Sequence, residues 1–247
     1  MIISSSSQLK ALREGGKILV SLTHKLQEAV EPGGNAASIN LLAKKITEEA
    51  DVTTAFEGYQ GFPGALCVSI NDEVAHGVPS EDKIFKEGDI VSLDFGIIYK
   101  GFYTDYAITF SLGEVDLETE ALIEVTKKAL EVAIREAKAG ARTGDIGFAI
   151  EQFVQKKGRY GVVKGLVGHG IGYGLHEAPQ IPNFGFPGMG YKLSEGEVIA
   201  IEPMITLGSG DIKVASDEQT YKTVDGSLAA HFEKTMVVTK EGVEVLT

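Results

Sequence analysis

The chain contains the run Glu87-Gly88-Asp89-Ile90-Val91-Ser92-Leu93-Asp94, and 108 residues later the run Glu195-Gly196-Glu197-Val198-Ile199-Ala200-Ile201-Glu202 follows the same pattern. Segments 105–110 and 233–238 also match, because each begins with an acid that a mostly apolar run follows. Internal similarity of this kind indicates a repeated structural unit. No linker separates the two copies. We therefore expect one domain, residues 1–247, made of two related halves at about 1–115 and 116–247.

The order of the predicted elements repeats in the same way. Helical spacing of apolar residues, together with N-cap and glycine signals, predicts helices over 8–30, 38–50, 118–139 and 143–157, the last with Thr143 as its N-cap. Strands are predicted for 90–98 and 102–110, and again near 198–205 and 232–239, after the glycine-rich stretch 165–174. Two helices followed by strands, twice over, predict an α/β (α+β) fold whose halves share one curved sheet.

The composition excludes several classes of function. The 247 residues are 43% hydrophobic and 23% charged, as in an ordinary globular protein, and the net charge is -12. Such an acidic surface opposes general binding to nucleic acids or anionic lipid. No apolar run approaches the roughly 20 residues that cross a bilayer, and the N-terminal residues lack the features of a signal peptide. We expect a cytoplasmic protein with no membrane association and no direct nucleic-acid function.

Each copy of the repeat ends on acidic residues inside predicted strands. Side chains alternate between faces along a strand, and a tight turn near residues 99–101 would pair the strands that carry Asp94 and Asp105. Their carboxylates would then lie directly or diagonally opposite each other on one face. Glu202 and Glu233 occupy the matching positions of the second half. A pseudo-twofold arrangement would therefore bring all four acids together.

Four carboxylates cannot share a buried site unless they bind protons or cations. Two divalent ions would balance four negative charges, and His169, which lies between glycines in 168–172, would add one nitrogen ligand. Oxygen ligands with a single imidazole suit manganese, iron, cobalt or zinc. A pair of such ions about 3.5–4 Å apart is a known device for activating water. The pattern therefore predicts a site for two divalent metal ions.

Each of these residues, taken alone, also admits another interpretation. A single acid at a strand end is usually solvated, and a lone histidine is usually a core residue, but four acids in repeated frames favour a function. The glycines of 168–172 do not form the G-x-G-x-x-G pattern that binds dinucleotides. Cys67 lies in an apolar run, which favours packing or a pocket wall over a nucleophile. His76 and His176, each taken alone, leave structural and functional roles equally open.

Seven short motifs together resemble those of the type I methionine aminopeptidases of metallopeptidase family M24, in their short bacterial form, over nearly the whole chain. The motifs are Asn71-Asp72-Glu73-Val74-Ala75-His76-Gly77-Val78-Pro79, Leu93-Asp94-Phe95-Gly96, Thr104-Asp105, Gly168-His169-Gly170-Ile171-Gly172, Leu175-His176-Glu177-Ala178-Pro179, Ile201-Glu202-Pro203-Met204 and Phe232-Glu233-Lys234-Thr235. The resemblance implies the pita-bread (creatinase/aminopeptidase) fold, in which two pseudo-symmetric halves share a curved antiparallel sheet with helices on its outer face. It also implies a hydrolase that removes the initiator methionine from nascent proteins when the second residue is small.

The resemblance further implies a role for each residue of the site. Asp94 would chelate one ion, His169 with Glu202 would hold the other, and Asp105 and Glu233 would bridge both. A metal-bound hydroxide would attack the scissile carbonyl, with Glu202 as the proton shuttle. His176 would stabilise the oxyanion, and His76 would contact the substrate near the scissile amide. The methionine pocket would consist of Phe56, Tyr59, Phe62, Cys67, Leu175 and Tyr221.

Four of these pocket residues, Phe56, Phe62, Leu175 and Tyr221, differ from those commonest in bacterial members, but they keep the pocket apolar. The expected partners are the N-termini of nascent polypeptides, and members of this length are usually monomers. The same task suggests docking on the ribosome, for which the acidic composition offers no support. Two alternatives remain: a prolidase or aminopeptidase P, which would need an N-terminal domain that has no room before residue 1, and a non-catalytic binding protein on the same fold.

Overall fold

The four predicted helices are present in the computed structural model, which describes residues 1–247. They are α1 (Ser6–Glu28), α2 (Ala36–Glu49), α3 (Leu117–Glu136) and α4 (Thr143–Lys157). The first three begin after Ser5, Asn35 and Asp116, whose side chains accept a backbone N–H three residues further on. Such acceptors satisfy the free N–H groups at a helix start, which is why these residue types are common N-caps.

The observed ends of α1 and α2 lie within two residues of the predicted ones, but two other predictions about helix ends are wrong. Thr143 is not the N-cap of α4, because it already lies inside the helix and Arg142 holds the cap position. There the side chain of Asp145, in the first turn, accepts the backbone N–H of Arg142 at 2.9 Å. Helix α3 ends at Glu136, since Ala137 is already extended.

A nine-stranded antiparallel sheet forms the centre of the molecule. Its main path is β1 (Thr53–Thr54), β4 (Ile90–Tyr99), β5 (Phe102–Ser111), β14 (Glu233–Val238), β9 (Val198–Ile201), β7 (Gly168–Gly170) and β8 (Glu177–Ile181). Strand β2 (Cys67–Ile70) adds to β4, and β15 (Val243–Val245) adds to β14. The pairing of β5 with β14 joins the strands of the first half of the chain to those of the second.

Two smaller sheets and one short helix complete the fold. The first small sheet has the order β13 (Ala229–His231), β10 (Met204–Thr206) and β6 (Gly161–Val162). The second has the order β11 (Ile212–Val214), β12 (Tyr221–Thr223) and β3 (Glu73–Ala75). A 3-10 turn, η1 (Tyr59–Gly61), lies between β1 and β2.

The hairpin of β4 and β5 forms as the sequence predicts. Tyr99 pairs with Phe102, and the two residues between them, Lys100 and Gly101, have φ values of 51° and 80°. Two-residue hairpin turns of this kind need positive φ at both positions, which glycine adopts without strain. This turn fixes the register along the whole ten-residue ladder and therefore decides which acids meet.

The prediction of one continuous strand over 198–205 is wrong. It is divided into β9, which ends at Ile201 in the large sheet, and β10, which begins at Met204 in a different sheet. Pro203 lies between them and has no N–H to donate to a ladder, so a strand breaks there. Within the glycine-rich stretch, for which no element is predicted, residues 168–170 form strand β7 between β9 and β8.

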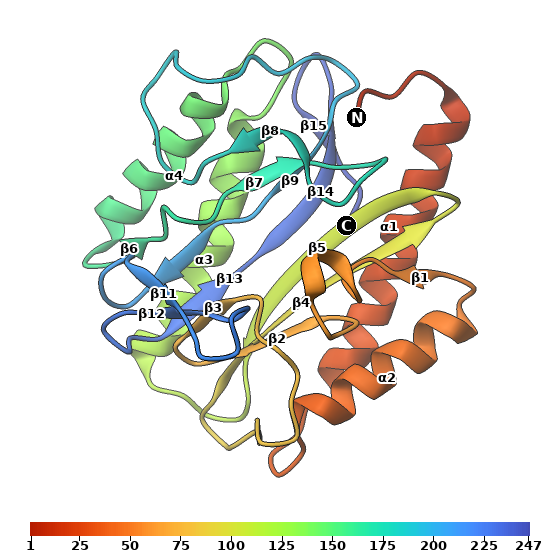
Figure 1. Cartoon of the computed structure of the whole chain (residues 1–247). Coiled ribbons are helices and arrows are strands. Elements are labelled where there is room, and N and C mark those ends of the chain that lie inside the picture. The colour runs from red at the N-terminus through yellow and green to blue at the C-terminus, as the bar shows by residue number, and fades with distance from the viewer.

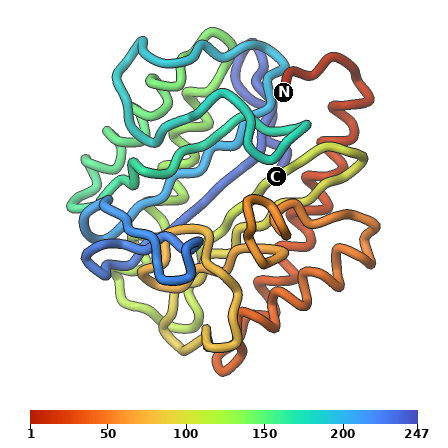
Figure 2. The backbone as a smooth tube through the Cα atoms, viewed as in Figure 1, coloured from red at the N-terminus to blue at the C-terminus, as the bar shows by residue number.

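Helices cover one face of the large sheet. Helices α1 and α2 lie beside the β4–β5 hairpin, and α3 and α4 lie on the other side of the molecule against the second half (Figure 1). The tube in Figure 2 shows residues near 105 running beside residues near 235 at the centre. A core of 39 buried residues fills the space between helices and sheet, and from β4 it takes Leu93, Phe95 and Ile97. Asp94 alternates with these residues and therefore faces away from the helices. None of the helices combines the length and the apolar character required to cross a membrane.

Candidate metal centre and substrate pocket

The predicted ligands of the first half lie on one face of the β4–β5 hairpin. Asp94 is directly opposite Ala107, and Asp105 is directly opposite Gly96. Residues directly opposite each other share a face, and so do residues two apart along a strand. Asp94 and Asp105 are therefore diagonal neighbours on the face that points away from the helices. The small partners Gly96 and Ala107 leave room beside the two carboxylates.

The register continues this face into the second half. Glu233 on β14 is also opposite Ala107, and on the same strand Thr235 is opposite Ala200 of β9. Ala200 is in turn opposite His169 of β7. Glu233 and His169 therefore share the face that carries Asp94 and Asp105.

Glu202 reaches the same place by a different route. Ile201 is the last residue of β9 and pairs with Lys234, so Glu202 follows the end of the ladder next to Glu233. The second half therefore does not copy the diagonal spacing of Asp94 and Asp105. The register leads Glu202 directly toward Glu233, whereas Asp94 and Asp105 are diagonal neighbours, so the two halves contribute different ligand geometries.

The four carboxylates are buried with little to compensate their charge. Asp94, Asp105 and Glu233 are 7%, 3% and 2% exposed. Oδ1 of Asp94 and Oε1 of Glu233 are buried without any hydrogen-bond partner. No lysine or arginine lines the cavity into which they point. Unpartnered buried carboxylates are costly, so the site requires either protons or cations.

The ionisation of these groups is strongly displaced by their surroundings. Burial raises the pKa of Asp105 to about 7 and the pKa of Glu202 to about 8, and the charge of Glu202 adds to the effect at Asp105. Burial, followed by the charges of neighbouring acids, raises the pKa of Asp94 and the pKa of Glu233 well above their usual values. Without a cation, the cluster therefore retains protons at neutral pH.

His169 faces the acids with a free nitrogen. Its Nδ1 lies 3.0 Å from the carbonyl oxygen of Gly170 and donates to it, which leaves Nε2 as the lone-pair atom. Nε2 lies 3.5 Å from Oε1 of Glu202 and 3.8 Å from Oε1 of Glu233. Burial lowers the pKa of His169 to about 3, so the ring is neutral. A neutral imidazole oriented by a backbone acceptor is a typical metal ligand.

The donor set fits divalent cations. Ligand atoms of Asp105, His169 and Glu233 all lie within 4.8 Å of one another, and Asp94 and Glu202 lie beside them. Four carboxylates without a basic neighbour would neutralise two dications, and the two orphaned oxygens would gain partners. Oxygen donors with one imidazole match first-row divalent metals better than thiophilic ones.

A cavity of about 540 Å³ opens over the acids and is lined by most of the predicted pocket residues, namely Phe56, Tyr59, Phe62, Cys67 and Leu175. These side chains belong to an apolar cluster separate from the main core. Burial raises the pKa of the Cys67 thiol well above its usual value, which agrees with a wall rather than a nucleophile. Tyr221 does not line this cavity. Its ring packs edge-on against that of His76 at 5.4 Å between centroids.

The two further histidines flank the acids. His176 is in edge contact with His169 at 4.4 Å between ring centroids, and its Nδ1 lies 3.0 Å from the hydroxyl of Tyr59. His76 lies at the cavity wall. Burial, followed by the charges of His231 and His176, lowers the pKa of His76 to about 4. Both rings therefore stand beside the carboxylates as neutral groups that can donate one hydrogen bond.

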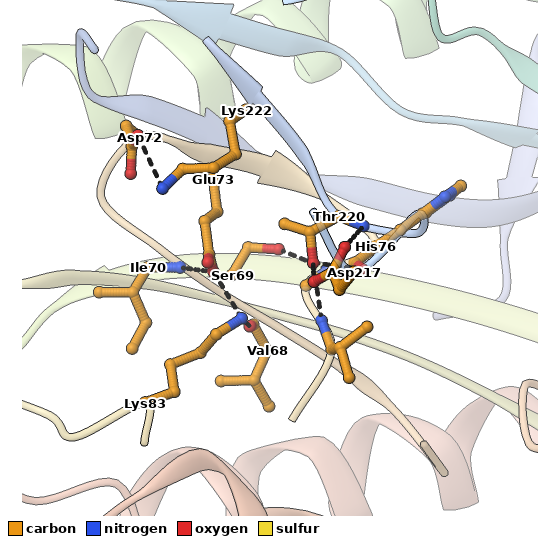
Figure 3. A network of polar contacts seen from close by, with 12 residues as sticks. Val68, Ser69, Ile70, Asp72, Glu73, His76, Lys83, Asp217, Thr220 and Lys222 are labelled. Atoms are coloured by element: carbon orange, nitrogen blue, oxygen red, sulfur yellow. Dashed lines mark hydrogen bonds and ion pairs between the residues drawn. The ribbon is translucent and has the colours of Figure 1, made fainter. Parts of the chain in front are cut away.

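The backbone of His76 is held in an unusual conformation. Its φ is 54°, a region that costs a non-glycine residue roughly 1 kcal/mol or more. The hydroxyl of Thr220 lies against this turn, where it donates to Asp217 at 2.6 Å and accepts the N–H of Val78 at 3.1 Å (Figure 3). It is also 3.4 Å from the carbonyl oxygen of His76. Thr220 is 1% exposed, whereas Asp217 is exposed, so the clamp joins a buried hydroxyl to a surface carboxylate.

A second clamp lies on the other side of the same loop. Lys83 donates from Nζ to Glu73 at 2.7 Å and to the carbonyl oxygen of Val68 at 3.0 Å (Figure 3). Glu73 also accepts the N–H of Ile70. The ion pair ties β3 to β2, and β2 carries Cys67 opposite Asp94. The segment between Cys67 and His76 is therefore fixed from both ends.

Two parts of the site are not predicted from the sequence. His231 is 1% exposed on β13 and lies beside Glu202. Its position two residues before Glu233 is the signal that could have drawn attention to it, because such residues share a face in a strand. Thr220 and Asp217 lie far from His76 in sequence, and no local pattern links them.

Comparison with known proteins places the chain in a family. The model described as "Metallopeptidase family M24" matches residues 10–240. The methionine aminopeptidase of Clostridium acetobutylicum is 42% identical over 247 residues, which span 100% of this chain and 98% of that protein. The crystal structure of methionine aminopeptidase from Thermotoga maritima has a TM-score of 0.96 and 43% identity, covering 100% of this chain and 99% of that chain. Xaa-Pro dipeptidase from Bacillus anthracis shares the fold, with a TM-score of 0.80 at 24% identity, and this chain covers 62% of it.

The chain belongs to metallopeptidase family M24 and, within that family, to the methionine aminopeptidases. The resemblance inferred from the seven motifs is therefore confirmed. The predicted pita-bread fold is confirmed as well, because the antiparallel sheet and its helices superpose on solved members along the whole chain. Use of divalent metal follows from the family, whereas the number and kind of ions do not.

Proposed function

We propose that this chain hydrolyses the peptide bond after an N-terminal methionine, and that it removes the initiator methionine of nascent polypeptides when the second residue is small. One observation carries the proposal: three buried carboxylates, a fourth that is partly buried and a neutral imidazole converge in one cavity that apolar side chains also line. Relatives that share about 40% of the sequence over the full length bear the name methionine aminopeptidase.

The proposed centre holds two divalent ions, with cobalt, manganese, iron and zinc as the candidates. Strand order supports the assignment of ligands. The two central strands, β5 and β14, carry Asp105 and Glu233, which are placed to bridge both ions. Asp94 lies on one outer side, and His169 with Glu202 lies on the other. When bound, the ions would polarise the scissile carbonyl and lower the pKa of the attacking water.

The remaining chemistry falls to side chains around the ions. Glu202 is the acid least enclosed by the sheet, and a carboxylate at the edge of the cluster can take a proton from water and return it to the leaving amine. His176, oriented by Tyr59, is placed to donate to the developing oxyanion. His76 lines the same cavity, where it would hold the peptide beside the scissile amide.

The cavity accounts for the choice of methionine. Its wall of Phe56, Phe62, Cys67 and Leu175 suits a long, flexible and uncharged side chain. The second residue of the substrate would lie between the acids and His76. A bulky side chain there would displace the carbonyl, and a misplacement of about 1 Å can cost 10²-fold in rate. Small second residues are therefore expected to be favoured.

The chain as a whole acts as one catalytic unit in this proposal. Residues 1–247 form a single domain whose halves, about 1–115 and 116–247, each supply ligands to one cluster, so neither half would be active alone. We place the enzyme in the cytoplasm as a monomer, where it meets nascent N-termini. Docking on the ribosome is compatible with that task, and no basic surface in the sequence supports it.

One assay tests the proposal. Metal-loaded protein is given Met-Ala-Ser, Met-Leu-Ser, an Xaa-Pro dipeptide and a peptide without N-terminal methionine. Rapid release of methionine from Met-Ala-Ser, with Met-Leu-Ser slower by about 10²-fold, is expected. Cleavage of the Xaa-Pro dipeptide alone would instead assign a prolidase. A protein that binds metal but cleaves none of the four would be a binding protein on this fold.

A further inference from the structure

His231 is a buried imidazole that the proposed ligand set does not use. Its backbone is fixed, because its N–H donates to Oγ1 of Thr109 at 2.8 Å and its carbonyl oxygen accepts from the same hydroxyl at 2.7 Å. Thr109 is itself 2.7 Å from the hydroxyl of Ser92. The ring, by contrast, has no partner at Nδ1 or Nε2 and is 1% exposed. A buried polar group without a partner costs roughly 1–3 kcal/mol, so an uncommitted ring at this depth requires an explanation.

The position of the ring is that of a ligand. Nε2 of His231 lies 3.6 Å from Oε2 of Glu202, which is too long for a hydrogen bond. Two donor atoms that bind one ion at about 2.1 Å each lie roughly 3.0–3.5 Å apart. On the opposite side of the same carboxylate, Nε2 of His169 lies 3.5 Å from Oε1. The two oxygens of Glu202 thus each face an imidazole nitrogen at nearly the same spacing.

Glu233 lies close enough to Glu202 and His231 to complete a set of three ligands. Ligand atoms of Glu202, His231 and Glu233 all lie within 4.8 Å of one another, as do those of Asp105, His169 and Glu233. We infer that His231 is a sixth metal ligand, which binds a divalent ion through Nε2 together with Glu202 and Glu233. This inference rests on the proposed metal centre, but it adds a donor that the set of five lacks.

A second imidazole ligand would also change which metal the site prefers. One imidazole among four carboxylates makes an oxygen-rich site that accepts manganese readily. A second imidazole raises the share of nitrogen donors, and such donors favour zinc, cobalt and iron over manganese. The chain should therefore prefer zinc over manganese more strongly than a site with His169 alone.

The test counts imidazole ligands. The full-length protein is stripped of metal, loaded with zinc and studied by zinc X-ray absorption, and metal analysis converts the count per ion into imidazoles per protein. We expect two imidazoles in the wild type and one in His231→Gln. His24→Gln, which removes an exposed histidine from α1, serves as the matched control and should keep two. Calorimetry should show that His231→Gln lowers zinc affinity by at least about tenfold.

Other outcomes overturn the inference. A wild-type protein with a single bound imidazole excludes His231 as a ligand, and this measurement stands even if the variant does not fold. Two imidazoles retained in His231→Gln would also exclude it. Zinc bound through one imidazole, in a protein that cleaves Met-Ala-Ser, refutes only this inference. No bound zinc and no cleavage would refute the proposed function.

Discussion

Addition of divalent ions to the metal-free protein should release protons. The ions bind the ionised carboxylates, whereas burial raises the pKa of Asp105 to about 7 and the pKa of Glu202 to about 8 in their absence. Protons held by these groups must leave when the ions bind. The buried histidines do not offset this release, because burial lowers the pKa of His169 to about 3 and the pKa of His231 to about 4, so both are already neutral.

The size of the effect follows from these values. Asp105 and Glu202 together hold about 1.7 protons at pH 6.5 and about one proton at pH 7.5. Asp94 and Glu233, whose pKa values burial also raises, add to this count. Because metal binding releases protons, the apparent metal affinity rises with pH. Its logarithm should increase by between about one and two per pH unit over this range, or by more where Asp94 and Glu233 contribute.

Calorimetric titration with manganese measures the release directly. The apparent enthalpy is compared in two buffers that bind metal weakly but differ in ionisation enthalpy, at pH 6.5 and at pH 7.5. Glu195→Gln, which removes an exposed acid far from the cluster, should leave the proton count unchanged. An enthalpy that does not depend on the buffer would refute the reasoning. Proton uptake, or a release that grows from pH 6.5 to pH 7.5, would refute it equally.

Three substitutions and one control substitution test separate parts of the site. Asp105→Asn should abolish peptide cleavage and lower the number of bound ions measured by metal analysis, and full activity would contradict the bridging role. His176→Ala should keep its ions while kcat falls by roughly 10²–10³; loss of ions would instead make His176 a ligand. Thr220→Val should lower kcat by about tenfold through a misplaced His76, with ion content and circular dichroism unchanged. Thr220→Ser should stay near wild type, and equal activity in the serine and valine variants would show that the hydroxyl is not needed.

The sequence predicts the first half of the site better than the second. Alternation along two strands and one tight turn suffices to place Asp94 and Asp105 on a common face, and the register confirms it. Alternation and turn geometry are local properties of the chain, and the pairing of two ten-residue strands leaves little freedom in register. Glu202 and Glu233 occupy the matching positions of the second half, but Ile201 pairs with Lys234, so the register leads Glu202 directly toward Glu233 instead of to a diagonal neighbour. An approximate repeat of residues does not guarantee a repeat of register.

Residues that reach the site through long-range contacts could not be predicted from the sequence, and the reason is physical. His231 reaches Glu202 only because β13 pairs with β10, where His231 is opposite Met204. Thr220 supports His76 only because β12 pairs with β3. Strands of three residues carry too little pattern to be predicted, and their pairing is fixed by tertiary packing. Alternation along the long strands β4 and β5 predicts Asp94 and Asp105, whereas His169 is predicted from its flanking glycines, because β7 has only three residues.

The break in the chain at Pro203 accounts for part of the difference in chemistry between the two halves. In the first half the hairpin continues past Asp94 and Asp105, so both carboxylates stay within the ladder and only oxygen donors meet there. In the second half the ladder stops, and the chain that leaves it at Pro203 becomes β10 of a separate sheet. That sheet presents the ring of His231 to one oxygen of Glu202, while β7 presents His169 to the other. Both imidazoles therefore enter through the half in which the repeat is broken. The break at Pro203 therefore accounts for the approach of His231 alone, because β7 pairs with β9 before that break.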